Sequence, residues 1–253
     1  MAPKPTGGVA LREKVNWLIH MQYVRLDYDA CLATIESHLK ECRGLSEYPI
    51  YVKALIKRQR GEIAESLQLF QAATCLNPHN VANLKQVGRS LYLLGRHKAA
   101  LDVYEEALKL GSEDWEIWHN KGLCNMYLKQ YDGAVECLKR ANFIQRHDST
   151  YMQLGKVYTL QEQYRTAIDV YIEALEFSPE NPELLTTVGL LYLRLGENYK
   201  ARGTAADCRA CSLLLLRCSL LTTADGCACS LLLLRCSLLT TADGCVCSLL
   251  LLR

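Results

Sequence analysis

The chain has 253 residues, of which 50% are hydrophobic and 22% charged, with 29 Lys and Arg against 27 Asp and Glu. The formal charge of +2 argues against nucleic acid as a partner, because a phosphate-binding surface normally carries a clear excess of cations. No apolar run of signal-peptide length follows Met1, so we expect a cytoplasmic protein.

The N-terminal part of the chain is the least regular. Residues 1–12 carry two prolines and two glycines with little apolar content, and they are predicted to be disordered. A degenerate helix pair follows, with helical apolar spacing at Trp17, Leu18, Tyr28, Cys31 and Ile35. This pair lacks the small residues that close helix contacts need, so it is expected to be a cap or a divergent repeat.

A period of about 34 residues organises the middle of the chain. Gly88, Gly122, Gly155 and Gly189 follow one another at intervals of 34, 33 and 34 residues. One period before Gly88 lies Ala54, so a further unit covers 47–80. This period is the mark of tetratricopeptide repeats, which are helix pairs that stack into a superhelix. We therefore predict an all-α tetratricopeptide-repeat solenoid over 13–201, with about five repeats plus one orphan helix.

The orphan helix runs from about 183 to 196. Its expected partner helix is replaced, from 202 onward, by a segment of a different composition. The array is therefore expected to end without the polar cap that solenoids use for solubility.

The segment 202–253 has its own 18-residue Leu/Cys repeat, with nearly identical copies that begin at Cys211, Cys229 and Cys247. Its leucines would point in every direction around a helix, and its apolar runs of about nine residues are too short to cross a bilayer. We expect an unstructured or aggregation-prone tail and no membrane span.

The tail leaves a metal-binding alternative open. Cysteine pairs at 208 and 211, 227 and 229, and 245 and 247 would offer soft thiolates to Zn or Cu(I) if they were brought together. No histidine accompanies them, and near-identical copies also arise from a duplication of coding DNA. The preferred interpretation is translated repetitive sequence with no metal site.

Nothing in the sequence indicates an enzyme. The six histidines are dispersed, without a cysteine or carboxylate at catalytic or ligand spacing, and no Gly-rich phosphate loop is present. We predict no catalytic residue and no cofactor.

The first helix of each repeat is expected to line an inner groove that binds polypeptides. The side chains at its non-packing positions are aromatic and mildly basic, which suits an acidic or extended peptide. They are Tyr51, Arg58, Lys85, Arg89, Tyr92, His119, Met126, Lys156 and Arg194.

A second binding mode is a carboxylate clamp of the kind that chaperone-type tetratricopeptide adaptors use for acidic C-terminal peptides. Lys85 and Asn120 fall where two of the clamp residues would lie. Ser149 and Gln153 occupy positions where cations are expected, and Arg89 replaces an asparagine. The clamp is thus half complete.

Several segments outside the repeat consensus carry a more specific resemblance. They are NWLIH at 16–20, NLKQVGRSL at 83–91, HKAA at 97–100, YLKQY at 127–131, FSPEN at 177–181 and LLTTVGLLYL at 184–193. Over roughly 14–201 the chain resembles the N-terminal half of the family of Bardet-Biedl syndrome protein four, a tetratricopeptide-repeat subunit of the BBSome.

This resemblance implies an adaptor subunit in ciliary membrane-protein trafficking and in organisation of the centrosome. The partners it implies are other BBSome subunits, a pericentriolar material protein and a dynactin subunit. The locations it implies are the centrosome, the centriolar satellites, the base of the cilium and association with the ciliary membrane. Family members continue through further repeats where this chain has its tail, so partners of their C-terminal half would be lost.

Overall fold

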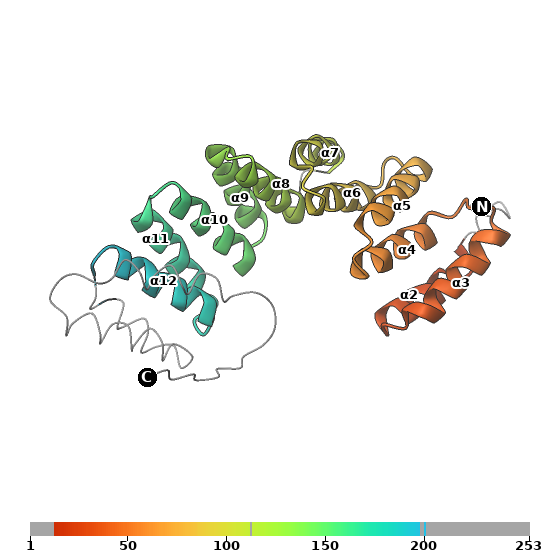
Figure 1. Ribbon diagram of the computed structural model, residues 1–253, viewed down its shortest axis with the longest axis horizontal. Coiled ribbons are helices and arrows are strands. Elements are labelled where there is room, and N and C mark those ends of the chain that lie inside the picture. Colours follow the sequence, from red (N-terminus) through yellow and green to blue (C-terminus); the bar gives the residue numbers. More distant parts are fainter. Residues whose placement is uncertain (1–12, 112, 198–199, 201–253) are drawn as a thin grey trace, which may run out of the picture. The chain divides into compact units, whose positions relative to one another are not determined.

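The computed structural model describes residues 13–111, 113–197 and 200 (Figure 1). These residues form helices and no strand. The helices are α2 (Asn16–Val24), α3 (Tyr28–Glu41), α4 (Glu47–Gln59), α5 (Ile63–Leu76), α6 (Val81–Leu93), α7 (His97–Leu110), α8 (Trp115–Tyr127), α9 (Tyr131–Ile144), α10 (Asp148–Leu160), α11 (Tyr164–Leu175) and α12 (Pro182–Arg194). The predictions for 1–12 and for the tail from 202 lie outside the described residues.

Consecutive helices pair as hairpins in chain order (Figure 1). The pairs are α2 with α3, α4 with α5, α6 with α7, α8 with α9, and α10 with α11. Within the first unit, the second helix of one pair also packs on the first helix of the next pair, as α3 on α4, α5 on α6, α7 on α8 and α9 on α10. The predicted all-α solenoid is thereby confirmed for the described residues. The chain comprises two compact units, one ending at Pro179 and the other starting at Glu180, and α12 belongs to the second.

The periodic glycines mark the closest approach between the two helices of a hairpin. A Cβ atom on Gly88 would lie 2.5 Å from Cε1 of Tyr104, and one on Gly122 would lie 2.8 Å from Cγ of Leu138. Gly155 lies under the ring of Tyr171 in the same way. Any larger residue would push the helices apart, which explains the period.

Hydrogen bonds tie the start of one repeat to the start of the next. The Glu47 carboxylate, at the beginning of α4, accepts from the side-chain amides of Asn77, Asn80 and Asn83 at 2.9, 2.5 and 2.7 Å. Three repeats later, the Ser178 hydroxyl donates to the Asp148 carboxylate at the beginning of α10. These bonds fix how successive hairpins follow one another.

The core of the first unit includes two apolar clusters among the described residues of α2 to α8. One joins α4 to α8 around the fully buried side chains of Phe70, Tyr104 and Ile117. The other packs α2 and α3 against α4, with Ile19 and Ile35 fully buried. The first hairpin thus belongs to the array.

The helical apolar spacing in the sequence suggests that Trp17 is buried, but its side chain is 68% exposed. Ile19, two residues further along α2, is the side chain that α2 buries instead. The first hairpin therefore contacts α4 through a smaller face than the sequence pattern indicates.

Candidate protein-docking surface

The first helices of neighbouring repeats contact one another directly, as α2 with α4, α6 with α8, and α8 with α10. They carry the side chains that the sequence singles out within the first unit. We call this set the first-helix face, and it consists of Tyr51, Arg58, Lys85, Arg89, Tyr92, His119, Asn120, Met126 and Lys156. Arg194 lies on α12, in the second unit, and is exposed.

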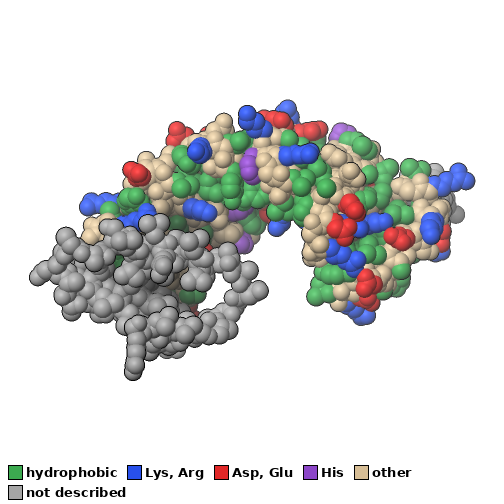
Figure 2. All heavy atoms as spheres, in the orientation of Figure 1, with side chains coloured by type: hydrophobic (Ala, Val, Ile, Leu, Met, Phe, Trp, Pro, Cys, Tyr) green, Lys and Arg blue, Asp and Glu red, His purple; other side chains and the backbone are tan. Residues whose placement is uncertain are grey.

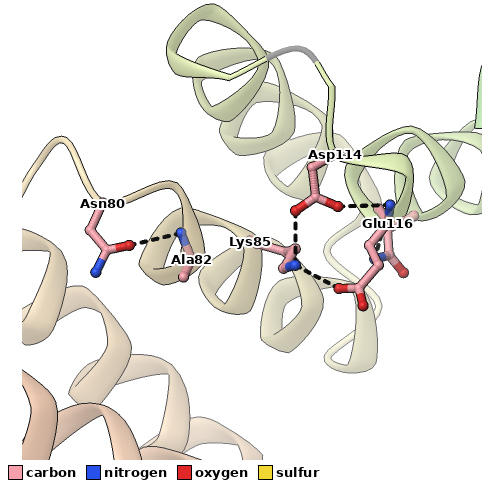
Figure 3. A network of polar contacts seen from close by, with 6 residues as sticks. Asn80, Ala82, Lys85, Asp114 and Glu116 are labelled. Atoms are coloured by element: carbon pink, nitrogen blue, oxygen red, sulfur yellow. Dashed lines mark hydrogen bonds and ion pairs between the residues drawn. The ribbon is translucent and has the colours of Figure 1, made fainter. Parts of the chain in front are cut away.

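Lys85 on α6 is held by two carboxylates at the start of α8 (Figure 3). Its Nζ lies 2.9 Å from Oδ2 of Asp114 and 2.7 Å from Oε2 of Glu116. Burial of Lys85 disfavours its charge, but the hydrogen bonds that it donates to Glu116 and Asp114 outweigh that effect and keep its pKa above the ordinary value. Asp114 also caps α8, because its Oδ1 accepts from the backbone N–H of Glu116 at 2.9 Å. The charge of Lys85 is therefore compensated within the chain.

Arg58 on α4 has a different environment. Its guanidinium lies over the Phe70 ring, with Cζ 5.3 Å from the ring centroid. Tyr51 meets the same ring edge-on, at a centroid distance of 5.5 Å. Burial lowers the pKa of Arg58, and the nearby cation Arg89 on α6 lowers it further. Among the described residues no carboxylate pairs with either arginine.

Tyr92, His97 and Tyr127 form an aromatic cluster that joins α6, α7 and α8. His97 stacks on Tyr127 at 4.9 Å, and Tyr92 meets Tyr127 edge-on at 5.6 Å. Burial raises the pKa of Tyr92, and its hydrogen bond with Tyr127 raises it further. Tyr92 is half-buried and Tyr127 is 55% exposed, so the cluster opens to solvent on the α8 side.

His119 links α8 to α10 through a 3.0 Å hydrogen bond between its Nδ1 and Oγ1 of Thr150. Burial, followed by the neighbouring His147 and Arg89, lowers the pKa of His119 to about 4. Trp115 meets the His119 ring edge-on and stacks on His147 at 4.9 Å. His119 is therefore a neutral side chain in the helix contact.

The remaining members of the face differ in accessibility. Asn120 donates its amide to the Glu116 carbonyl at 2.7 Å, and Met126 is only 6% exposed. Lys156 is exposed on α10. Both groups of the half-complete clamp, Lys85 and Asn120, are thus already bound to Glu116.

Sequence reasoning missed the groups that decide the charge of this face. Asp114 and Glu116 neutralise Lys85 from the following repeat, and the only sequence signal is their position at the start of the next first helix. The side chain of Tyr104 is fully buried, and its hydroxyl has no hydrogen-bond partner among the described residues.

A cleft lies between α3, α4 and α5, and the lysines that line it are paired with glutamates. Lys53 lies 3.3 Å from Glu36, and Lys57 lies 3.0 Å from Glu65. No three or more His, Cys, Asp or Glu among the residues described converge in an arrangement that could hold a metal ion. Over the same residues, every helix is too short or too polar to span a membrane.

The tetratricopeptide-repeat family matches residues 51–114 and 86–146, and a further match to the repeat covers 155–196. The chain belongs to the tetratricopeptide-repeat family. A solved structure from Pseudomonas aeruginosa, pilF, shares the fold with a TM-score of 0.68 at 18% identity, covering 79% of this chain and 91% of that one. The tetratricopeptide fold predicted for 13–201 is confirmed over the matched residues.

Two relatives are similar in sequence over most of the chain. BBSome complex member BBS4 of Bos taurus is 57% identical over 189 residues, which are 75% of this chain and 36% of the relative. The Mus musculus protein of the same name is also 57% identical, over 72% of this chain and 35% of the relative. This tetratricopeptide-repeat chain thus spans about a third of the length of these relatives.

Proposed function

We propose that the chain is a non-enzymatic protein–protein interaction scaffold, a BBSome-like adaptor in ciliary membrane-protein trafficking and in organisation of the centrosome and centriolar satellites. The observation that carries this proposal is the 57% identity to BBSome complex member BBS4 over 75% of the chain. A stack of helix hairpins supports it physically, because such stacks present an extended surface for other polypeptides.

The docking surface we propose is the first-helix face of the first unit, and Arg194 on α12 is proposed separately as a contact residue of the second unit. Its side chains are held in place before a partner arrives, since Lys85 and His119 each bond to the next first helix. A preorganised surface loses less conformational entropy on binding. Aromatic and cationic groups on it, such as Tyr92 and Arg89, are common anchors of protein interfaces.

The partners we propose are other BBSome subunits, a pericentriolar material protein and a dynactin subunit. The corresponding locations are the cytoplasm, the centrosome, the centriolar satellites and the base of the cilium, with association to the ciliary membrane through partners. The mixture of both charge signs on the displayed face (Figure 2) fits protein partners better than nucleic acid. It also agrees with the near-neutral formal charge of the chain.

Affinity purification from ciliated cells tests this function. The tagged full chain is expected to recover BBSome subunits, the pericentriolar material protein and the dynactin subunit, quantified by mass spectrometry. Arg89→Glu and Lys156→Glu should each reduce the recovery, because they reverse exposed charges of the proposed surface. Arg165→Glu on α11 is the matched control and should recover partners as the unaltered chain does.

Lys85 needs a separate variant in this experiment. Lys85→Glu would also leave Asp114 and Glu116 beside a third carboxylate, so a loss of partners would mix binding with stability. Lys85→Gln is the better choice, with helical content checked by circular dichroism. Recovery of no BBSome subunit by the folded, unaltered chain would contradict the proposed function.

A further inference from the structure

An open pocket of about 450 Å³ lies where the turn between α6 and α7 meets the end of α8. Its lining consists of Gly95, Arg96, His97, Lys98, Ala99 and Leu128. None of these residues belongs to the first-helix face. Most of the lining is apolar, because lysine and arginine contribute their methylene groups to such a surface while their charges stay in water. The pocket thus combines an apolar surface with two cations.

These two cations have no counter-ion in the part of the chain that the structure describes. No Asp or Glu lines the pocket, and neither Arg96 nor Lys98 forms an ion pair with a described carboxylate. The cleft between α3, α4 and α5 differs, because its lysines are paired with glutamates. Unlike that cleft, the pocket at the end of α8 therefore carries an uncompensated positive charge.

An aspartate bridges the corresponding junction in two other repeats. Asp29 is the second residue of α3, and it accepts a hydrogen bond at 2.6 Å from Arg60, the residue that follows α4. Asp132 is the second residue of α9, and it accepts one at 3.2 Å from Gln161, the residue that follows α10. Each bridge ties the start of a second helix to the end of the next first helix.

The α7–α8 junction lacks the residues for this bridge. Lys98 is the second residue of α7 and Leu128 follows α8, so a cation replaces the aspartate and a leucine replaces its donor. The pocket lies at this place. At the α5–α6 junction both positions are apolar, Ala64 and Leu94, so no charge is left there without a partner. The α7–α8 junction therefore lacks a carboxylate at the position where the bridged junctions have one.

Apolar side chains beside the pocket extend its contact surface. His97 lines the pocket and stacks on Tyr127, with the ring centroids 4.9 Å apart. Tyr127 is 55% exposed and directly precedes Leu128 in the chain. A ligand that carries a carboxylate next to an apolar group matches this combination. An acidic residue beside an apolar one in a polypeptide supplies both groups.

We propose that the α7–α8 junction binds a segment of a partner polypeptide in which an acidic side chain adjoins an apolar residue. The carboxylate supplies the group that an aspartate provides at the α3–α4 and α9–α10 junctions, and it pairs with Arg96 and Lys98. Its apolar neighbour packs on Leu128 and Tyr127. This inference goes beyond the proposed function, because it assigns a second docking site outside the first-helix face.

Fluorescence anisotropy with the full chain tests the site. The probe is a labelled peptide of nine residues, amidated at its C-terminus, with two glutamates beside a central phenylalanine and flanks of glycine and serine. The reference peptide has glutamines in place of the glutamates. The glutamate peptide is expected to bind about 3- to 10-fold more tightly at low salt, because exposed ion pairs each contribute modestly. The preference should shrink at high salt, since salt screens exposed charges.

A rebuilt bridge separates binding from folding. Lys98→Asp combined with Leu128→Gln reproduces the pair found at the α9–α10 junction, so this double variant is expected to fold and to lose the preference for glutamate. Arg96→Gln should lower the preference about twofold or more. Lys109→Gln, at an exposed lysine near the other end of α7, is the matched control and should retain it. Circular dichroism checks the folding of each variant.

A photoreactive benzophenone in place of the phenylalanine locates the bound peptide. Cross-links to 95–99 and 127–128, mapped by mass spectrometry, support the site, whereas cross-links confined to the first-helix face overturn it. Equal affinities for the two peptides, or no binding of either, also overturn the site. So does an unaltered preference in the folded double variant. Loss of BBSome subunits in the cell experiment contradicts the proposed function alone, because the peptide measurement uses the purified chain.

Discussion

Gly88 has no room for a larger side chain, since its α-carbon lies under the Tyr104 ring. A Cβ atom there would stand 2.5 Å from Cε1 and 2.7 Å from Cζ of a side chain that is itself fully buried. Gly88→Ala is therefore expected to destabilise the chain by about 1–3 kcal/mol, through overpacking. Urea unfolding followed by circular dichroism measures the change.

Gly111→Ala is the matched control for this substitution. The added Cβ would meet Cγ2 of Val81 at 3.5 Å, an ordinary contact, so a change within about 0.5 kcal/mol is expected. If Gly88→Ala were as mild as Gly111→Ala, close helix approach could not be the reason for the glycine period.

His119 makes stability depend on pH. Its pKa is lowered from 6.5 to about 4 in the folded chain, first by burial and then by His147 and Arg89. Between pH 6.5 and pH 4 the unfolded chain therefore binds more protons than the folded one, so stability falls as the pH is lowered through this window. The largest loss from this group is about 3 kcal/mol, and most of the stability is retained at pH 7.

Replacing His119 by glutamine should flatten this dependence, because glutamine does not titrate and can still bond to Thr150. Urea unfolding at pH 7, 6 and 5 would show the smaller slope. His79→Gln, at an exposed histidine, should follow the unaltered chain. Identical slopes for all three proteins would mean that His119 titrates normally.

At the scale of the element, the turn inside each hairpin repeats one backbone conformation. Gly61, Gly95 and Gly196 have positive φ angles of 84°, 75° and 75° at the end of α4, α6 and α12. In the equivalent turns after α8 and α10, Lys129 and Glu162 occupy the position of this glycine, with φ angles of 61° and 62°. A residue with a Cβ pays about 1–2 kcal/mol in this region.

Lys129→Gly should therefore stabilise the α8–α9 hairpin by about 0.5–1 kcal/mol, after the entropy cost of glycine in the unfolded chain is subtracted. The reverse change, Gly95→Ala, should destabilise the α6–α7 hairpin by about 1 kcal/mol. Thermal unfolding of the two variants gives both values. A lower melting temperature for Lys129→Gly would show that the Lys129 side chain contributes more than its backbone strain costs.

These turns also show what sequence reasoning can and cannot reach. The glycine at each helix crossing is visible because its requirement is local and recurs with the repeat. Lys129 and Glu162 adopt the same turn without a glycine, since the packed helices on either side impose it. Trp17 fits an apolar helix spacing, yet only the arrangement of α2 on α4 decides that Ile19 is buried in its place.

The candidate site is less predictable than the fold for the same reason. The sequence identifies Arg58, Lys85 and Arg89 as members of one basic face, because they share a repeat register. Of these three cations, Lys85 is the one that carboxylates neutralise. The two carboxylates come from another repeat, at the start of α8. The unpartnered hydroxyl of Tyr104 is likewise a product of packing.

At the scale of the whole molecule, stability in such an array comes from neighbouring elements. Within the first unit, the helix contacts join a helix to those one or two places along the chain. Each hairpin therefore depends mainly on its direct neighbours, as is usual in solenoids. A change at one end of the chain should leave distant hairpins folded.

Deletion of residues 203–253 applies this rule to the C-terminal segment. That segment holds eight of the thirteen cysteines, Cys208 to Cys247, and long leucine runs between them. Its removal is expected to increase the soluble yield and to abolish most disulfide-linked oligomers, because free thiols and apolar runs promote association. Helical content per described residue is expected to be unchanged, because each helix from α2 to α11 packs on other described helices that the deletion retains. Circular dichroism and non-reducing electrophoresis of the shortened and full chains measure both effects. Loss of the helical signal on deletion would show that 203–253 contributes contacts on which the array depends.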